Sequence, residues 1–145
     1  MTTNDIELVK NSWALVAKMD MAAVGGLFYH RLFELMPEVK PMFNRTSMPE
    51  QSKKLLTMLS YVISKLDKLE EIMDEVVKLA QRHTHYGVKE EHYTAVGTAL
   101  LGTLEKGLGE HWNDEVRLAW TEVYSTLAVA MMTVQKAGTK PMPLQ

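Results

Sequence analysis

The 145-residue chain contains no cysteine, which excludes a disulfide framework, a thiolate zinc site and a cysteine nucleophile. It also has no excess of charge of one sign, because 16 Lys and Arg stand against 18 Asp and Glu and the formal net charge is -2. A chain with this balance has no strong field with which to hold nucleic acid or an anionic membrane. We therefore expect neither as a partner, and the absence of cysteine fits a reducing compartment.

Long apolar runs are also absent. The longest nearly uncharged stretch covers 123–135 and is shorter than the roughly 20 residues that a membrane-spanning helix needs. The N-terminus is acidic and polar, without the basic and apolar regions of a signal peptide. Together these absences predict a cytoplasmic protein. At 145 residues, the chain has the length of one domain with a substantial core.

Signals for β-strands are almost missing, because the chain has no Asn-Gly or Asp-Gly hairpin turn and no long alternating run of β-branched residues. Apolar residues instead recur at steps of three and four, a spacing that places them on one face of a helix. The pattern predicts an all-α domain over 1–137 and a flexible tail over 138–145. We expect helices near 4–19, 21–36, 48–66, 70–85, 90–107 and 113–137, with a short helical turn at 37–43.

Helix starts are predicted where a capping acceptor stands three residues before Glu. This spacing occurs in Asn4 with Glu7, Ser47 with Glu50 and Asp67 with Glu70. Gly25 and Gly26 fall inside a predicted helix, although each glycine costs about 1 kcal/mol there relative to alanine. Either another helix crosses close to them or the helix has a local break.

His83 is the one histidine of five that continues an apolar stripe in step. Its stripe consists of Ile72, Val76 and Leu79. An imidazole that points into a core needs a hydrogen-bond partner, so the pattern fits a structural core histidine as well as a metal ligand or a catalytic group. The other histidines are His30, His85, His92 and His111.

Gln51 and Tyr29 are two further polar residues that the pattern directs inward. Gln51 stands one turn before Leu55 at the head of an apolar stripe, although such a position is often a partly exposed helix end. Tyr29 lies in an apolar stretch, and tyrosines are common in cores. The chain has no phosphate-binding glycine loop, no Gly-x-Ser-x-Gly and no His-Glu-x-x-His, which argues against kinase and hydrolase chemistry.

A series of landmarks runs along about 4–137. They are Trp13, Leu27-Phe28-Tyr29-x-x-Leu32-Phe33, Pro37, Phe43, Gln51-x-x-x-Leu55, Gln81-Arg82-His83-x-x-x-Gly87-Val88, Tyr93-x-x-Val96-Gly97 and Ala119-Trp120-x-x-x-Tyr124. In order and spacing this series resembles the globins, in particular single-domain bacterial haemoglobins, the haem domain of flavohaemoglobins, and neuroglobin. The resemblance implies a globin fold of about seven helices packed around a haem pocket.

The resemblance further implies that His83 is the axial ligand of the iron of haem b. Neutral imidazole is a usual ligand where oxygen is bound, and the carbonyl of Leu79, one turn back, is the natural acceptor for its other ring nitrogen. Leu55 would lie on the distal face of the ring and Val88 on the proximal side. The haem contacts that the resemblance implies besides His83 are Phe43, Gln51, Lys54, Leu55, Leu79, Arg82, Val88 and Tyr93.

On the distal side the resemblance places Gln51 where myoglobin has histidine, with Tyr29 beside it. Both side chains are hydrogen-bond donors, and bound oxygen carries partial negative charge. We therefore expect high oxygen affinity and slow release. The alternative is that Gln51 swings out to solvent and Tyr29 alone stabilises the ligand.

On the proximal side the resemblance is incomplete. In flavohaemoglobins the proximal histidine is tied to a tyrosine and a glutamate; Tyr93 matches the tyrosine, but Gln135 stands at the glutamate position. A neutral amide cannot accept the charge of the imidazole proton as a carboxylate does. We expect a weaker electron push toward bound oxygen, unless Gln135 faces solvent near the end of the last helix.

These implications favour a haem protein that binds oxygen reversibly, for storage, delivery or buffering. The alternative is a nitric oxide dioxygenase served by an external reductase, because Tyr29 and Gln51 resemble the dioxygenase pocket. A third class, a non-haem helical sensor or adaptor, would be expected to lack His83. The implied ligands are O2, CO and NO, and we expect a monomer or a weak homodimer.

Overall fold

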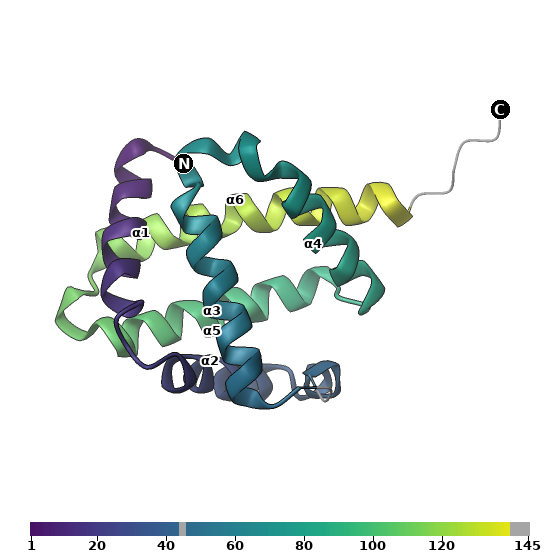
Figure 1. Ribbon diagram of the computed structural model, residues 1–145, viewed down its shortest axis with the longest axis horizontal. Helices are drawn as coiled ribbons and strands as arrows, with labels where there is room; N and C mark the ends of the chain where they lie inside the picture. Colours follow the sequence, from purple (N-terminus) through teal and green to yellow (C-terminus); the bar gives the residue numbers. More distant parts are fainter. Residues whose placement is uncertain (44–45, 140–145) are drawn as a thin grey trace.

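The computed structural model describes residues 1–43 and 46–139, and over these residues it contains helices and no strand (Figure 1). The α-helices are α1 (Thr3–Val16), α2 (Met21–Leu35), α3 (Met48–Ser64), α4 (Met73–His85), α5 (Glu90–Leu108) and α6 (Asp114–Thr139). Short 3-10 helices are η1 (Pro37–Phe43), η2 (Leu66–Ile72) and η3 (Gly109–His111). The all-α prediction is confirmed. α6 continues to Thr139, beyond the predicted boundary at 137, and the rest of the predicted tail, 140–145, lies outside the described residues.

Two of the three predicted helix starts are wrong. α1 is capped by Thr2, whose hydroxyl accepts the Asp5 N–H while the Asp5 carboxylate accepts the Thr2 N–H, so Asn4 is not the cap. Asp67 lies inside η2, where Lys68 departs from helical geometry (φ -140°, ψ 48°), and α4 begins only after it. The predicted helix start at Ser47 is confirmed, since the Ser47 hydroxyl accepts the Glu50 N–H at 3.4 Å.

The buried hydrophobic residues of the described ranges form two clusters, a larger one that includes Trp13, Phe28 and Trp120 and a smaller one that includes Val76 and Tyr93; Figure 1 shows how the helices are arranged. α1 and α4 both pack on α6, and α2 packs against α3 and α5. In Figure 1 α3 runs in front of α5 and α6, with α4 on its right. Over the described residues, α3 and α4 do not pack extensively against each other. No helix in the described ranges is long and apolar enough to cross a membrane.

Two tryptophans fix the position of α1. The rings of Trp13 and Trp120 lie 5.9 Å apart between centroids, tilted by 57°. The Trp13 indole N–H donates to the Ser60 hydroxyl at 2.9 Å, and that of Trp120 donates to the Ser12 hydroxyl at 2.8 Å. Because both indoles are buried and both N–H groups are bonded, neither carries the penalty of an unpaired buried donor. These bonds tie α1 to α3 and to α6.

Gly25 marks the close crossing of α2 and α3. A Cβ built on Gly25 would overlap the Ser52 side chain and lie 2.8 Å from the Ser52 Cα, whereas a Cβ on Gly26 would meet nothing within 4 Å. α2 is continuous through both glycines. The structure therefore confirms a close helix crossing at Gly25 and excludes a local break.

Replacing each of the two glycines by alanine should change stability in opposite directions. Gly25→Ala is expected to lower the free energy of unfolding by about 1–3 kcal/mol, because the added methyl forces the α2 and α3 backbones apart. Gly26→Ala is the matched control and should raise it by about 0.4–1 kcal/mol, through the better helix propensity of alanine. Urea unfolding followed by circular dichroism measures both. A stabilising Gly25→Ala would show that the crossing relaxes freely.

Candidate functional site

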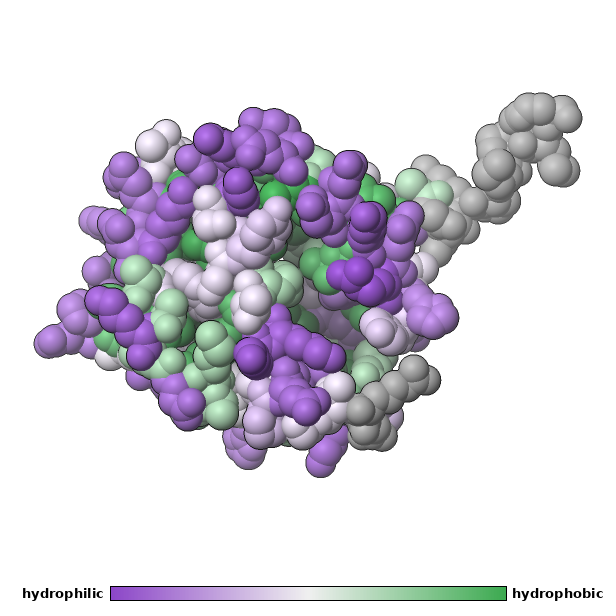
Figure 2. Space-filling model, viewed as in Figure 1, coloured by the Kyte–Doolittle hydropathy of each residue, from purple (hydrophilic) through white to green (hydrophobic). Residues whose placement is uncertain are grey.

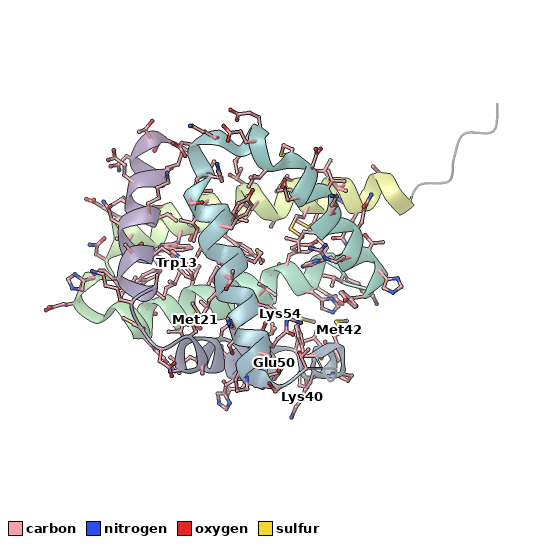
Figure 3. All side chains as sticks on the ribbon, in the orientation of Figure 1. Trp13, Met21, Lys40, Met42, Glu50 and Lys54 are labelled. Atoms are coloured by element: carbon pink, nitrogen blue, oxygen red, sulfur yellow. The ribbon has the colours of Figure 1, made fainter. Side chains whose placement is uncertain are left out.

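A cavity of about 610 Å³ opens between η1, the beginning of α3 and the end of α4. This volume falls within the range of about 300–1,000 Å³ that is usual for ligand sites. In Figure 2 hydrophobic side chains show in the hollow beside α3, and Figure 3 places Lys54 of α3 next to Met42 of η1. The cavity is lined by Pro41, Met42, Phe43, Thr46, Gln51, Lys54, His85 and Tyr86.

His83 lies on the last turn of α4, two residues before His85, and is half-buried. Its Nδ1 is 2.8 Å from the carbonyl oxygen of Leu79, the partner that the sequence analysis expects. Because a carbonyl only accepts, Nδ1 carries the hydrogen and Nε2 keeps a free lone pair. Burial lowers the pKa of His83 despite the opposing hydrogen bond to Leu79, and the charge of Arg82 lowers it further. The imidazole is therefore neutral, the form that binds metals.

The end of α4 fixes the chain after His83. Gly87 has a φ of 77°, in the left-handed region that glycine adopts without strain. The Val88 N–H donates to the His83 carbonyl at 2.9 Å, and the Gly87 N–H donates to the Thr84 carbonyl at 3.0 Å. This pair of bonds is a Schellman motif. It turns the chain sharply and brings Val88 back to the His83 side.

Tyr93 and Gln135 complete the surroundings of His83. The rings of Tyr93 and His83 are stacked with centroids 6.2 Å apart and planes inclined by 22°. The Tyr93 hydroxyl donates to Oε1 of Gln135, and Nε2 of Gln135 donates to the Val88 carbonyl at 3.0 Å. Gln135 thus joins α6 to α5 and to the turn after α4, which excludes the alternative that it simply faces solvent. Burial raises the pKa of Tyr93 to about 12, so its phenol is a neutral donor.

Gln135→Glu is expected to destabilise the protein increasingly as the pH rises. An ionised carboxylate can still accept from Tyr93, but it cannot donate to the Val88 carbonyl and repels it. Only the protonated carboxyl can make both bonds, so its folded pKa is raised above the ordinary ~4.3. The contribution of this carboxyl to the free energy of unfolding is then fully present below its unfolded pKa. That contribution is lost as the pH rises through its folded pKa.

At neutral pH we expect the free energy of unfolding to be about 1–3 kcal/mol lower than that of the unaltered protein, the cost of leaving the partly buried Val88 carbonyl without its donor. The difference should shrink toward pH 4. Unfolding by urea at a series of pH values measures it. A difference that does not change with pH would contradict the donation from Gln135 to Val88.

Tyr29 lies buried among aromatic rings between α2 and η1. Its ring centroid is 5.0 Å from that of Phe28, 5.9 Å from that of Phe33 and 5.2 Å from that of Phe43. Burial raises the pKa of Tyr29, and a side-chain hydrogen bond with Gln51 opposes that rise. Tyr29 and Gln51, which the globin resemblance pairs on one side of the site, therefore lie near each other.

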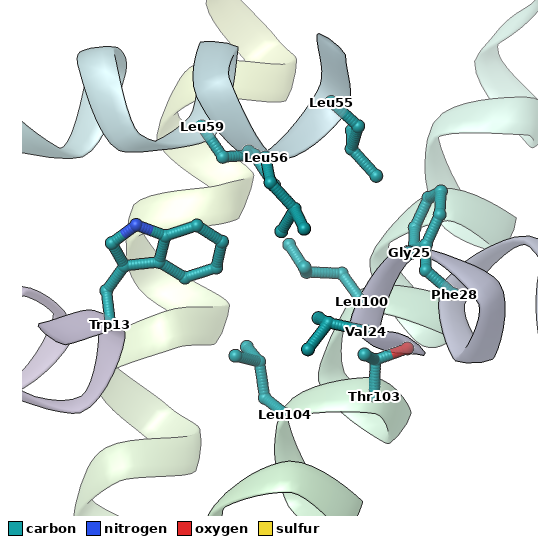
Figure 4. A pocket seen from close by; sticks show the side chains of 10 residues that line it. All are labelled: Trp13, Val24, Gly25, Phe28, Leu55, Leu56, Leu59, Leu100, Thr103 and Leu104. Atoms are coloured by element: carbon teal, nitrogen blue, oxygen red, sulfur yellow. The ribbon is translucent and has the colours of Figure 1, made fainter. Parts of the chain in front are cut away.

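A second, apolar cavity of about 10 Å³ lies between α1, α2, α3 and α5. Figure 4 shows Leu55 and Leu59 of α3, Trp13 of α1 and Phe28 of α2 around it. It is at the lower limit for holding one water, and its apolar walls offer a water no hydrogen-bond partners. Leu55 lines this small cavity and not the large one, so its predicted contact with the ligand face stays a prediction.

The structure brings most of the predicted site residues together in two groups. Phe43, Gln51 and Lys54 line the larger cavity. Leu79, Val88 and Tyr93 belong to the apolar cluster beneath His83. Arg82 is exposed and lines neither cavity. His83 and Tyr29 do not line the larger cavity directly.

Sequence reasoning assigned no site role to five residues of the larger cavity: Pro41, Met42, Thr46, His85 and Tyr86. Met42 directly precedes the predicted Phe43, but nothing in the periodicity marks Met42 or Tyr86. Thr46 carried a usable signal, because it directly precedes Ser47, the residue that caps α3. Its hydroxyl donates to Oε1 of Gln51 at 2.8 Å.

Comparison with known proteins establishes the family. The family model described as Globin matches residues 26–131, and the chain belongs to the globin family. It is 30% identical over 144 residues to a neuroglobin of Tetraodon nigroviridis, with 90% of each chain covered. It is 34% identical over 123 residues to a flavohemoprotein of Oceanobacillus iheyensis, with 83% of this chain but only 30% of the relative covered.

Solved structures show the same fold. A bacterial globin from Campylobacter jejuni matches with a TM-score of 0.81 and 30% identity, over 94% of this chain and 97% of that one. An engineered carbene transferase, a putative nitric oxide dioxygenase from Rhodothermus marinus, matches with a TM-score of 0.84 over 95% of each chain. At 23% identity, this second likeness concerns the fold alone. The prediction of a globin fold is confirmed.

Proposed function

We propose that the protein binds haem b through Nε2 of His83 and binds dioxygen reversibly, to store, deliver or buffer it. The observation that carries the proposal is the bond from Nδ1 of His83 to the Leu79 carbonyl, which leaves the Nε2 lone pair free; His83 stands two residues before His85, which lines the cavity of about 610 Å³. Haem supplies an iron that binds diatomic gases, and the protein supplies an axial imidazole and the surroundings that tune it.

The residues around the cavity fit such a cofactor. Phe43 and Met42 give an apolar wall for a flat ring, and the Lys54 ammonium stands at the rim, where it can pair with the carboxylates of haem. His83 is neutral and held in one tautomer by Leu79. A fixed second partner of this kind sets the ring orientation of a metal-binding histidine.

Tyr29 and Gln51 support gas binding on the opposite side. A hydrogen bond to a ligand with charge character contributes about 1.5–3 kcal/mol, which corresponds to a tenfold to hundredfold effect on affinity. CO and NO would bind in the same position, and CO, which carries less charge, would gain less from these donors.

We propose a monomer or weak homodimer in the cytoplasm, and a domain that spans 1–137.

Haem titration tests the proposal. The protein is mixed with increasing haem, and the Soret band is followed. We expect saturation at one haem per chain, with a spectrum that changes when CO is added to the reduced protein. Failure to bind haem would contradict the proposal and favour the third class, a non-haem helical sensor or adaptor.

A nitric oxide dioxygenase is the second candidate function. The pairing of Tyr29 with Gln51 and the relatives named flavohemoprotein support it, and its electrons would come from a reductase. Gln135 weighs against it, because its neutral amide adds no anionic charge near Tyr93 and His83. Steady-state consumption of NO in the presence of O2 and a reductase separates the two functions. Slow consumption relative to a flavohaemoprotein supports oxygen binding, and comparable consumption supports the dioxygenase.

A further inference from the structure

Two polar side chains line the larger cavity from different helices and take no part in the hydrogen bonds of the fold. Lys54 belongs to α3, and His85 is the last residue of α4. Within 1–43 and 46–139, neither the Lys54 ammonium nor the His85 imidazole has a hydrogen bond or an ion pair. The described residues that line the cavity include no Asp or Glu. Both side chains are therefore available to a ligand, and the charge of Lys54 favours an anionic one.

The position of His85 is set by the same turn that follows His83. The Tyr86 N–H donates to the Arg82 carbonyl at 3.0 Å and ends α4 directly after His85. The rings of His85 and Tyr86 meet edge to face, with centroids 5.8 Å apart and planes inclined by 64°. Because Tyr86 also lines the cavity, this contact holds the imidazole at the cavity wall. In either neutral tautomer of His85, one ring nitrogen carries a hydrogen that it can donate.

The cavity separates two helices that the chain itself does not join. Over the described residues, α3 and α4 do not pack extensively against each other, and no hydrogen bond or ion pair links them. Arg82, the cation of α4 that the resemblance implies as a haem contact, lines neither cavity. Within the described part of α4, the residue that lines the cavity is His85. A ligand with one carboxylate near Lys54 and another near His85 would connect the two helices.

We propose that His85 is a haem-binding residue, which donates a hydrogen bond to one carboxylate of haem b while Lys54 pairs with the other. The inference rests on the proposed function, because haem b is the ligand and carries two carboxylates. Hydrogen bonds from N–H donors to carboxylates are charge-assisted and stronger than those between neutral groups. Through its carboxylates the ligand links α3 to α4, and so it stabilises the helix that bears His83.

The rate at which haem leaves the protein tests the inference, with an excess of a second haem-binding protein as the acceptor. His85→Leu should raise this rate about three- to tenfold, the effect of one hydrogen bond. His85→Gln keeps an N–H donor and should raise it less than twofold. His111→Leu is the matched control and should not change the rate, since His111 is an exposed histidine of η3 that lines neither cavity.

Haem dimethyl ester separates a carboxylate contact from simple packing. Its two carboxyl groups are esterified, so they carry no charge and accept hydrogen bonds more weakly. The unaltered protein should therefore lose the ester faster than haem, and His85→Leu should change the rate for the ester less than twofold. A residue that only packs against the ring would affect both ligands equally. The visible spectrum of each complex should stay the same in His85→Leu, because the axial ligand is unchanged.

Two results would overturn the inference while leaving the proposed function intact: an unchanged rate of haem loss in His85→Leu, or an equal rise in that rate for haem and for its dimethyl ester. Circular dichroism of the haem-free variants checks that His85→Leu and His85→Gln fold alike. Failure of the unaltered protein to bind haem would instead overturn the proposed function, and the inference with it.

Discussion

Replacing His83 by Ala is expected to abolish stable haem binding. The substitution removes the free Nε2 lone pair, the one ligand that we propose for the iron, and leaves only the apolar wall and the Lys54 ammonium to hold the ring. It also removes the side-chain partner of the Leu79 carbonyl on α4, which water can replace because His83 is only half-buried. Haem titration followed by the Soret band measures the loss, and circular dichroism of the haem-free protein checks that the helices remain.

The controls for His83→Ala are two other histidines. His30 is exposed on α2, so His30→Ala should bind haem normally. His85 lines the larger cavity, and His85→Ala should keep the same axial ligand with at most a modest change in affinity. If His83→Ala keeps the unaltered spectrum and His85→Ala loses it, the ligand is His85 and the assignment is wrong.

Tyr29→Phe is expected to speed O2 dissociation by about ten- to a hundredfold. The substitution keeps the ring and its contacts with Phe28, Phe33 and Phe43, and it deletes one hydroxyl. The lost bond to a ligand with charge character corresponds to roughly 1.5–3 kcal/mol. Stopped-flow replacement of O2 by CO measures the rate. CO dissociation should change less, because bound CO carries less negative charge.

An unchanged O2 dissociation rate in Tyr29→Phe would show that Tyr29 does not touch the ligand. Gln51→Leu then decides whether the amide is the donor. If Gln51→Leu speeds O2 dissociation and Tyr29→Phe does not, Gln51 donates directly to the ligand.

The features that the sequence predicted well depend on local spacing. The number and approximate positions of the α-helices follow from apolar steps of three and four, and the Ser47 cap follows from a contact three residues along the chain. The bond from His83 to Leu79 spans one helical turn, so it follows as soon as α4 is recognised. The pairing of Tyr29 with Gln51 came from the globin resemblance, because no local rule joins α2 to α3.

The features that the sequence did not predict depend on tertiary contacts or on competing caps. The globin resemblance placed Gln135 near Tyr93, but the bond from Gln135 to the Val88 carbonyl spans 47 residues and appears only when α6 packs on α4. At the N-terminus two capping pairs compete, and Thr2 prevails because Asp5 returns a bond to it. The sequence around Asp67 resembles a helix start, but the backbone at Lys68 in η2 is not helical. α4 therefore begins further along the chain, at Met73.

The visible absorption spectrum of the reduced, haem-loaded protein, recorded before and after O2 is admitted, tests the central claim most directly. The claim is that His83 supplies one axial ligand and that Tyr29 and Gln51 leave the opposite position open for a gas. It predicts a five-coordinate spectrum without O2 and an immediate, reversible shift to a six-coordinate one with O2. A six-coordinate spectrum before O2 is admitted, or one that O2 does not change, would contradict the account.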